Sequence, residues 1–540
     1  MIAGSILIEV ESSEPAGPGS LTDQLAASGH PLNARCGQRG LCRGCMVDLV
    51  EGILLGPDGE SVGPGATVRS CQMRLPPGGR VSVRIHPQAR ISRSAQVGET
   101  FVIDVPVEFD PATGARPGKD RAFAVDIGTT TVVVMIIDLT TGAILSRAGD
   151  FSAQIRFGDN VITRIGAGAN PATRLLMRDA LVKETLGPLL AKACRRADTD
   201  PGRLAGGAIA GNTTMLHILA DEDPTPLGIA PFTARFLDGR VLRATGIGLD
   251  LSGLDPDLPL QLLPGLSAYL GADITAGVHA SGMMLDAMPA LLVDMGTNGE
   301  VVLSAAGRLV GCATAAGPAF EGAGLLSGTR AQDGAISAIH FATDPFSLDL
   351  EVIGGRSTAS GPPVGICGSA YIDFLALARA AGLLRENGRF DRAIWDRLPP
   401  DCRDESPDGL VFRLAGGQGP GISEIDIAHL LQAKAAIGAG IEILLTATGI
   451  RAADIGRVYL AGGFGMHINV SHAIAIGLLP GFHPDQVRVV GNTALAGALL
   501  AVIDRTALAE MDVLRQRIEV LELNLQPAFE DSYIDHLGLP

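Results

Sequence analysis

The sequence predicts a multidomain protein: a small α+β unit comes first, and a larger α/β region built from two related halves follows. Three observations predict this class. The chain has 540 residues, which is too many for one ordinary domain. Four of its eight cysteines fall within the first 71 residues. From residue 121 onward, strand-like and helix-like stretches alternate, and one strand–turn–strand motif occurs twice, around Asp126 and Asp294.

The N-terminal unit is predicted from alternating apolar residues. Ile6–Val10 and Val81–Ile85 alternate as strands, and Ser20–Asp23 is a helix-capping sequence before Gln24–Ser28. A connector follows, because residues 110–120 are dense in Pro and Gly. The expected domains are residues 1–90 (cysteine-containing unit), 91–120 (linker), 121–205 (middle domain with the first Asp-Gly-Thr turn) and 206–540 (C-terminal domain).

The larger region is predicted as α/β because its apolar strands alternate with amphipathic helices. Thr131–Ile137 and Leu291–Val293 are strand-like, whereas Arg174–Leu190 and Ile427–Leu445 are helix-like. The sequence Val-Asp-Ile-Gly-Thr-Thr ending at Thr130 is echoed by Val-Asp-Met-Gly-Thr-Asn 168 residues later, since 294 − 126 = 168. We expect two related halves that face each other; a chance similarity of two turns is the alternative.

Composition excludes several function classes. Lys+Arg number 42 and Asp+Glu 58, which gives a net charge of −16 and disfavours nucleic acid or an anionic membrane as a partner. Charged residues are only 19% of the chain, so it is not a disordered polyanion. The first ten residues lack a targeting pattern, and the uncharged run Val458–Phe482 is interrupted by glycine, asparagine and histidine. We therefore expect a soluble, cytoplasmic protein.

The cysteine cluster indicates an iron–sulfur site. Cys36, Cys42, Cys45 and Cys71 are spaced C-x5-C-x2-C followed by a distant cysteine, close to the plant-type ferredoxin pattern C-x4-C-x2-C. Four thiolates suit a [2Fe–2S] cluster, and the glycines between them let backbone N–H groups point at sulfur. A zinc site and structural cysteines are the alternatives, but only one C-x2-C pair is present. The other four cysteines are expected to be buried thiols.

Glycine-rich turns indicate a phosphate-binding site that is neither a P-loop nor a Rossmann site, since the chain lacks both motifs. Asp126 ends one strand and Asp294 another, and each could hold Mg²⁺, usually through water. The turns that follow can aim N–H groups and hydroxyls at phosphate oxygens. A third signal is the apolar strand from Val458 that runs into Gly462-Gly463. Two opposed turns would clamp a triphosphate from both sides.

The order of these motifs resembles the actin, hexokinase and acetate-kinase superfamily, whose members bind ATP between two RNase H-like halves. With the cysteine unit added, nearly the whole chain resembles one family, the reductive activators of corrinoid proteins. The matching stretches are Ala124–Thr131, Gln154–Arg164, Ala210–Met215, Gly271–Asp273, Val293–Glu300, Ala316–Gly322, Gly365–Ser369, Leu460–Gly465 and Gly491–Gly497. The chain departs from the family pattern in a shortened first hairpin, Glu11–Gly19, and a shortened connector.

The resemblance implies a β-grasp-like ferredoxin domain followed by duplicated RNase H-like domains of an actin-like ATPase. It also implies the activity: ATP-coupled transfer of one electron to the Co(II) corrinoid of a methyltransferase-system protein, restoring Co(I). The implied partners are that corrinoid protein, an electron donor (a flavin reductase or a ferredoxin) and a second copy of the chain. No nucleic-acid or membrane partner is expected.

Residue roles follow from the turns and the resemblance together. Asp126 and Asp294 are expected beside Mg²⁺ or the attacking water. The expected nucleotide contacts are Gly128, Thr129, Thr130, Gly296, Thr297, Asn298, Gly317, Gly462 and Gly463. For Gly317, Glu321 and Asp273 a structural role competes with a nucleotide role, and Glu321 could simply cap a helix. Cys367 is expected to be a packed residue near the cleft, and the histidines at 217, 279, 467 and 472 to be core or surface residues rather than cobalt ligands.

Three other functions stay open on sequence grounds. A small-molecule kinase of the same superfamily would need a catalytic base over a substrate pocket, and would leave the four cysteines without a purpose. An activator of the radical dehydratase or benzoyl-CoA reductase type holds a cluster between two subunits, unlike a self-contained four-cysteine unit. A plain electron carrier with an inactive nucleotide fold is the non-enzymatic alternative.

Overall fold

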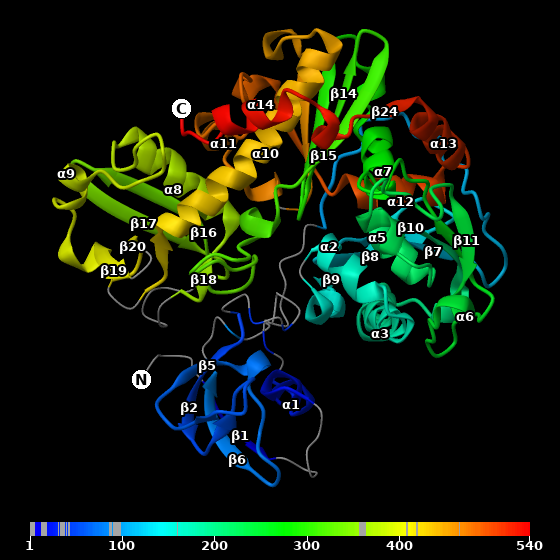
Figure 1. The fold of residues 1–540 in the computed structure, drawn as a ribbon. Coiled ribbons are helices and arrows are strands. Elements are labelled where there is room, and N and C mark those ends of the chain that lie inside the picture. The colour runs from blue at the N-terminus through cyan, green and yellow to red at the C-terminus, as the bar shows by residue number, and fades with distance from the viewer. Residues whose placement is uncertain are drawn as a thin grey trace.

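A computed structural model gives the architecture (Figure 1). The structure describes residues 6–11, 19–30, 32, 38, 40, 44–85, 89, 99–158, 160–355, 363–406, 409–416, 419–463 and 465–540.

The N-terminal unit is a four-stranded antiparallel sheet with one helix. The sheet has the order β1-β6-β2-β5, and its bounds and those of the small elements beside it are β1 (Ile6–Glu11), α1 (Leu21–Ala27), β2 (Met46–Glu51), β3 (Leu54–Leu55), β4 (Ser61–Val62), β5 (Thr67–Arg69) and β6 (Arg80–Ile85). Ser20 caps α1 in a reciprocal capping box with Asp23, as the sequence predicted. Leu21 and Leu25 on α1 are fully buried against the sheet. In Figure 1 this unit lies below the rest of the molecule.

The first half of the larger region is a six-stranded mixed sheet with helices packed on it. Its strand order is β11-β12-β10-β7-β8-β9. The strands are β7 (Arg121–Ile127), β8 (Thr131–Asp138), β9 (Ile144–Phe151), β10 (Leu204–Gly211), β11 (Arg240–Arg243) and β12 (Pro259–Leu262). The helices are α2 (Val161–Gly168), α3 (Pro171–Leu181), α4 (Gly187–Arg196), α5 (Thr213–Leu219), α6 (Ala244–Ile247) and α7 (Ala272–Ser281). The helix expected over Arg174–Leu190 spans α3, a π-helical turn and the start of α4.

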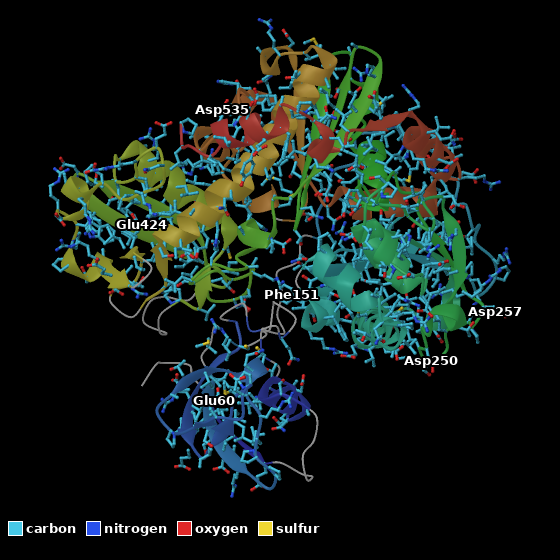
Figure 2. The ribbon with its side chains drawn as sticks, viewed as in Figure 1. Glu60, Phe151, Asp250, Asp257, Glu424 and Asp535 are labelled. Atoms are coloured by element: carbon cyan, nitrogen blue, oxygen red, sulfur yellow. The ribbon has the colours of Figure 1, made fainter. Side chains whose placement is uncertain are left out.

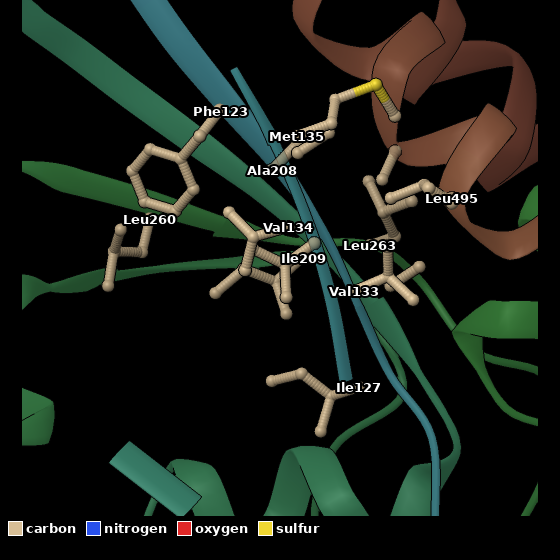
Figure 3. Packing of buried hydrophobic residues seen from close by; sticks show 14 of the residues in the cluster. Phe123, Ile127, Val133, Val134, Met135, Ala208, Ile209, Leu260, Leu263 and Leu495 are labelled. Atoms are coloured by element: carbon tan, nitrogen blue, oxygen red, sulfur yellow. The ribbon is translucent and has the colours of Figure 1, made fainter. Parts of the chain in front are cut away.

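The core of this half is close-packed around its central strands. Phe123 on β7 and Val134 on β8 are fully buried, with Ile209 on β10 and Leu260 on β12 beside them (Figure 3). Gly207 leaves room for the Phe123 ring, since a Cβ there would lie 2.5 Å from it. The strands are nearly continuous apolar runs because they are covered on both faces.

The second half repeats the antiparallel β-meander and then adds parallel strands. Its strand order is β23-β22-β13-β14-β15-β24. The strands are β13 (Ala290–Met295), β14 (Gly299–Ala305), β15 (Arg308–Thr314), β22 (Arg457–Ala461), β23 (Val487–Gly491) and β24 (Ile518–Val520). The helices are α10 (Glu424–Thr448), α11 (Val470–Ala475), α12 (Thr493–Ile503), α13 (Ala507–Arg517) and α14 (Phe529–Asp535). The pairing β7-β8-β9 in one sheet and β13-β14-β15 in the other supports the inference of two related halves.

A smaller subdomain is inserted between β15 and α10. It consists of β16 (Ala335–Thr343), β17 (Phe346–Val352), β18 (Gly365–Ile366), α8 (Gly368–Ala380), α9 (Arg392–Trp395), β19 (Arg403–Ser406), β20 (Gly409–Arg413) and β21 (Gly421–Ser423). In Figure 1 it stands apart from the first half, on the left. The helix α10 passes from this subdomain to the second sheet. It is long and apolar enough to cross a membrane, but 72% of its apolar window is buried inside the protein, as in a core helix.

Two helices connect the halves. α7 and α12 pack closely, because Gly497 of α12 lies against Ala276 of α7, where a Cβ on Gly497 would come within 2.4 Å. The described part of the connector is also docked rather than free. The Val102 N–H donates to Val490 O on β23 (2.9 Å), and the Asn492 N–H donates to Thr100 O (3.0 Å). The described part of the connector thus begins along the edge of the second sheet, and further on it contacts the end of α12, where the Asp110 N–H donates to Ile503 O.

Candidate functional site

A cavity of about 360 Å³ opens between the two halves, and both Asp-Gly-Thr turns line it. The β7–β8 turn contributes Asp126 and residues 128–131, and the β13–β14 turn contributes residues 294–298. Gly462 and Gly463, at the end of β22, line the same cavity. Gly317 is the exception among the predicted nucleotide residues: it lines a neighbouring cavity of about 640 Å³, which shares Asn298 with the first.

The two turns have the tight geometry expected of strand–turn–strand units. The Gly128 N–H donates to Thr131 O (2.9 Å), and the Gly296 N–H donates to Asn298 O (3.0 Å). The Thr130 and Thr297 hydroxyl oxygens lie only 3.2 Å apart, although 167 residues separate them. The halves therefore bring the two turns into direct contact.

Glu321 bridges the turns. It is the last residue of a short 3₁₀ helix, η8 (Pro318–Glu321), and its two carboxylate oxygens accept from the Thr130 hydroxyl (2.7 Å) and the Thr297 hydroxyl (2.9 Å). Glu321 lies at the end of this helix but does not cap it, because its carboxylate oxygens accept from the two threonine hydroxyls and the flanking cap residues are Gly317 and Gly322.

Two asparagines orient the first turn. Asn212 caps α5 and donates from Nδ2 to the Thr129 hydroxyl (2.9 Å), while Asn492 caps α12 and donates to Asp126 Oδ2 (2.8 Å). Each follows a glycine at the end of a parallel strand, which is where ligand sites of α/β sheets form. Both asparagines lie in stretches that resemble the family, Ala210–Met215 and Gly491–Gly497, but local sequence does not predict a hydrogen bond between residues 366 positions apart.

Four buried carboxyl groups share the floor of the cavity. Burial raises the pKa of Asp126 to about 6, and burial together with the neighbouring Asp126 raises the pKa of Asp273 to about 7. Burial, Asp273 and Asp126 raise the pKa of Asp294 to about 8, and burial with Asp273 and Asp294 nearby raises the pKa of Glu300. Clustered carboxyl groups with raised pKa values lose their protons less readily, and a bound cation would favour their ionised forms. Asp273 therefore belongs to the site, although a structural role was the stronger expectation.

This acidic floor suits a hydrated divalent cation. Within the described ranges, no set of three or more His, Cys, Asp or Glu is close enough to hold a metal ion directly. Carboxylates at this spacing fit Mg²⁺ that keeps several of its waters. Glu300 was missed as a site residue. Its signal was a single acidic residue in the apolar strand β14.

Only glycine fits at position 462, because of its backbone conformation and the closeness of its neighbours. Its φ is +95°, and a Cβ there would lie 2.3 Å from Met295 O and 2.9 Å from Asp294 Oδ1. The end of β22 therefore lies directly on the second turn. The inserted subdomain lines this side of the cavity with Ser337, Cys367 and Ser369, and a short 3₁₀ helix, η12 (Gly465–His467), adds His467.

Arg330 and Phe151 form a cation–π pair in the lining of the cavity. The Arg330 guanidinium lies 4.9 Å from the centroid of the Phe151 ring, and both residues line the cavity. Phe151 ends β9 and lies near the centre of the molecule in Figure 2. Neither residue belongs to a sequence motif for this site, because their contact joins the first half to the second.

Of the four predicted cluster ligands, the structure describes two. Cys45 and Cys71 are buried together, and a hydrogen bond with Cys45 lowers the pKa of Cys71 to about 6. The Gly40 N–H also hydrogen-bonds to Cys71, and Gln72 Nε2 lies 3.6 Å from its sulfur. Cys36 and Cys42 lie outside the described residues. A pair of thiols, one with a lowered pKa and N–H donors around it, fits a thiolate-bound cluster.

The comparisons with known proteins then decide the family. Residues 121–286 match the profile of the RACo middle region, and residues 288–540 match that of the C-terminal domain of RACo, the ASKHA domain. The corrinoid activation enzyme RamQ of Eubacterium limosum is 32% identical over 427 residues, which is 76% of this chain and 69% of RamQ. The chain belongs to the family of reductive activators of corrinoid proteins.

Other relatives agree with this assignment. The [Co(II) methylated amine-specific corrinoid protein] reductase of Methanosarcina barkeri is 24% identical over 447 residues, covering 77% of this chain and 76% of that protein. A solved reductive activator for a corrinoid, iron-sulfur protein superposes with a TM-score of 0.72 at 29% identity, over 98% of this chain and 96% of that one. The superfamily predicted from the order of the two turns and the Gly462-Gly463 strand end, and the enzyme class predicted with it, are thereby confirmed, with an actin-like ASKHA domain at the C-terminus.

Four of the other cysteines and histidines are held by their surroundings: Cys194 and Cys367 are buried, and His217 and His472 are hydrogen-bonded. Burial raises the pKa of Cys194 to about 11 and of Cys367 to about 12, so both stay as neutral thiols. His217 is fully buried: its Nδ1 lies 2.7 Å from Thr213 O and its Nε2 accepts from the Arg235 N–H. His472 is paired with Asp373 at 2.7 Å.

Proposed function

We propose that this protein is an ATP-dependent reductive activator that transfers one electron from its own [2Fe–2S] cluster to the Co(II) corrinoid of a methyltransferase-system corrinoid protein, restoring Co(I). One observation carries the proposal: a single chain of the activator family combines a cavity lined by two phosphate-type turns with a separate, paired-thiol unit. A kinase would need only the cavity with its two turns, and an electron carrier would need only the paired-thiol unit. The named relatives act on corrinoid proteins, which supports the same substrate class here.

Cys36, Cys42, Cys45 and Cys71 would hold the cluster in a β-grasp-like ferredoxin domain. When bound, the cluster supplies a one-electron redox centre at low potential. The described residues around it fit this role, because Cys45 and Cys71 lie together and the Gly40 N–H points at sulfur. The upstream electron donor would be a flavin reductase or a ferredoxin, and the net charge of −16 disfavours nucleic acid as a partner.

In the cavity, the turns would bind the phosphates of ATP and the acidic floor would bind hydrated Mg²⁺. Thr129 and Thr130 on one side and Thr297 and Asn298 on the other would contact phosphate oxygens, while the bare backbone at Gly462 and Gly463 would lie beside adenosine. Asp126 and Asp294 would orient metal-bound water, with one of them receiving a proton from the attacking water. Because the halves carry one turn each, a nucleotide that touches both turns stabilises the closed cleft.

Closure of the cleft would couple ATP binding to the uphill electron transfer by changing how this protein binds the corrinoid protein. A ligand shifts a conformational equilibrium only through its differential affinity for the two states. A cleft closed by ATP would present a different surface to the corrinoid protein, and docking on that surface would alter the surroundings of cobalt. Hydrolysis and release of phosphate would then reopen the cleft and free the reduced partner.

A single-turnover experiment tests the proposal. The pre-reduced protein is mixed with a Co(II) corrinoid protein, with and without ATP and Mg²⁺, and Co(I) is followed by its visible absorption. We expect Co(I) to form only with ATP and Mg²⁺, and iron and acid-labile sulfide analysis to give two of each per chain. Full-rate Co(I) formation without ATP would refute the coupling, and absence of sulfide would refute the cluster.

A further inference from the structure

The bridge made by Glu321 occupies the donors that a bound phosphate would need. Thr130 and Thr297 are each only 7% exposed, and each directs its hydroxyl to a different oxygen of the same carboxylate. These two threonines come from different halves of the protein. Glu321 is thus the third member of a hydrogen-bonded bridge across the nucleotide cleft.

A threonine hydroxyl has a single proton to donate. While Thr130 and Thr297 donate to Glu321, neither can donate to a phosphate oxygen. A phosphate oxygen placed to accept from either hydroxyl would also come close to a Glu321 oxygen, and two negative groups at that separation repel each other in a partly buried site. The carboxylate and a phosphate therefore compete for the same two protons and the same space.

We propose that Glu321 is an internal stand-in for phosphate, which holds the two turns together in the nucleotide-free cleft and which the nucleotide must displace. This proposal rests on the proposed binding of ATP and deepens it, because it identifies the residue that sets nucleotide affinity. The backbone permits the displacement: η8 is bounded by Gly317 and Gly322, whose φ angles are both positive (+70° and +75°), a region that glycine adopts readily. Only an anion that reaches both turns replaces both hydrogen bonds that Glu321 gives up.

The test is the affinity of the full-length protein for the non-hydrolysable analogue AMPPNP with Mg²⁺, measured by isothermal titration calorimetry. Glu321→Ala removes the competitor, so we expect AMPPNP to bind about tenfold more tightly or better, since hydrogen bonds to a charged group are worth about that much. Glu321→Gln keeps the shape but removes the charge, so its dissociation constant should fall between those of wild type and Glu321→Ala.

A matched control removes a glutamate elsewhere. Glu519 pairs with Arg308 at 2.7 Å on the surface, and Glu519→Ala should leave AMPPNP affinity unchanged. Coupling is tested in a Thr297→Val background, where one of the two contested donors is absent and the gain from Glu321→Ala should shrink. Thermal melts establish that each variant is folded, and Glu321→Gln keeps the test available if Glu321→Ala unfolds.

The outcomes separate the two levels of the proposal. Tighter binding by both Glu321 variants supports the stand-in. Weaker or unchanged binding by folded Glu321→Gln and Glu321→Ala, with normal binding by wild type, overturns it and shows that Glu321 instead helps hold the Mg²⁺–nucleotide complex or plays no part; ATP binding itself then still stands. Failure of wild type and all variants to bind AMPPNP overturns the proposed function and the stand-in together.

Discussion

Replacement of Asp294 by asparagine should change how the stability of the nucleotide-free protein depends on pH. Burial and the nearby carboxyl groups of Asp273 and Asp126 raise the pKa of Asp294 from an ordinary 3.8 to about 8. In the unfolded chain the same group ionises near its ordinary value. Between these two pKa values the folded state therefore holds a proton that the unfolded state has released.

The sign of the effect follows from this difference in bound protons. Because the folded state binds more protons, its free energy of unfolding decreases as pH rises from about 4 through about 8. One proton corresponds to about 1.4 kcal/mol per pH unit, so raising the pH from 5.5 to 8 would cost wild type about 3 kcal/mol from this group. The asparagine of the variant would carry no charge at any of these pH values and resembles the protonated acid in shape.

Differential scanning calorimetry of wild type and Asp294→Asn at pH 5.5, 7 and 8.5, without nucleotide or divalent cation, measures the difference. We expect the two proteins to melt at similar temperatures at pH 5.5 and the variant to melt several degrees higher at pH 8.5. Added Mg²⁺ should narrow the gap by stabilising ionised Asp294 in wild type. Parallel pH profiles, or a variant that is equally destabilised at every pH, would show that Asp294 is ionised and satisfied in the folded protein.

Three further substitutions have distinct expected outcomes. Cys71→Ser should lower the iron and acid-labile sulfide content of purified protein, whereas Cys194→Ser, a buried thiol in the first half, should leave both unchanged; equal loss in both would contradict the ligand assignment. Lys434→Met should destabilise the protein by about 2–4 kcal/mol, because the buried ammonium donates to two backbone carbonyls (2.6 Å each), and limited proteolysis of the last helix should report it; unchanged cleavage would count against this anchor. Gly497→Val should push α12 away from Ala276 of α7 and cost about 1–3 kcal/mol, measured by thermal melting, and an unchanged melt would mean that the two helices separate freely.

What the sequence predicted well is local. A strand ending in aspartate, followed by Gly-Thr and a second strand, is a complete unit within a dozen residues, so both turns were found with their residues in the expected places. The helix expected over Ile427–Leu445 was found within α10 for the same reason: its apolar period and its flanking Ser423 and Gly449 are contiguous. The superfamily followed from the order of such units along the chain.

What the sequence did not predict depends on contacts between the halves. Glu321 is 191 residues from Thr130, and its position at the end of a short helix gives the same local pattern whether it caps that helix or bridges two turns. The raised pKa of Asp273 likewise depends on Asp126 being folded against it. Contacts between the halves, including the packing of α7 against α12 and the Thr130–Glu321–Thr297 bridge, bring these groups into one cavity. The domain boundary expected at residue 205 also depends on contacts between distant parts of the chain, and it stays a prediction.

The charges of two groups in the cleft are therefore linked: those of the buried carboxyl groups and that of the Glu321 carboxylate. Without nucleotide, the raised pKa of Asp294, about 8, favours its protonated form at neutral pH, and the hydroxyls of the two turns donate to Glu321. Binding of Mg²⁺ and a triphosphate would change both. The cation would favour the ionised forms of Asp126 and Asp294, and the phosphate would repel the like-charged carboxylate of Glu321. Binding of the cation and binding of the triphosphate would favour each other, because the two ligands carry opposite charges. An ATP-driven activator needs such a pairing, because the closed cleft should form with Mg²⁺ and triphosphate together and with neither alone.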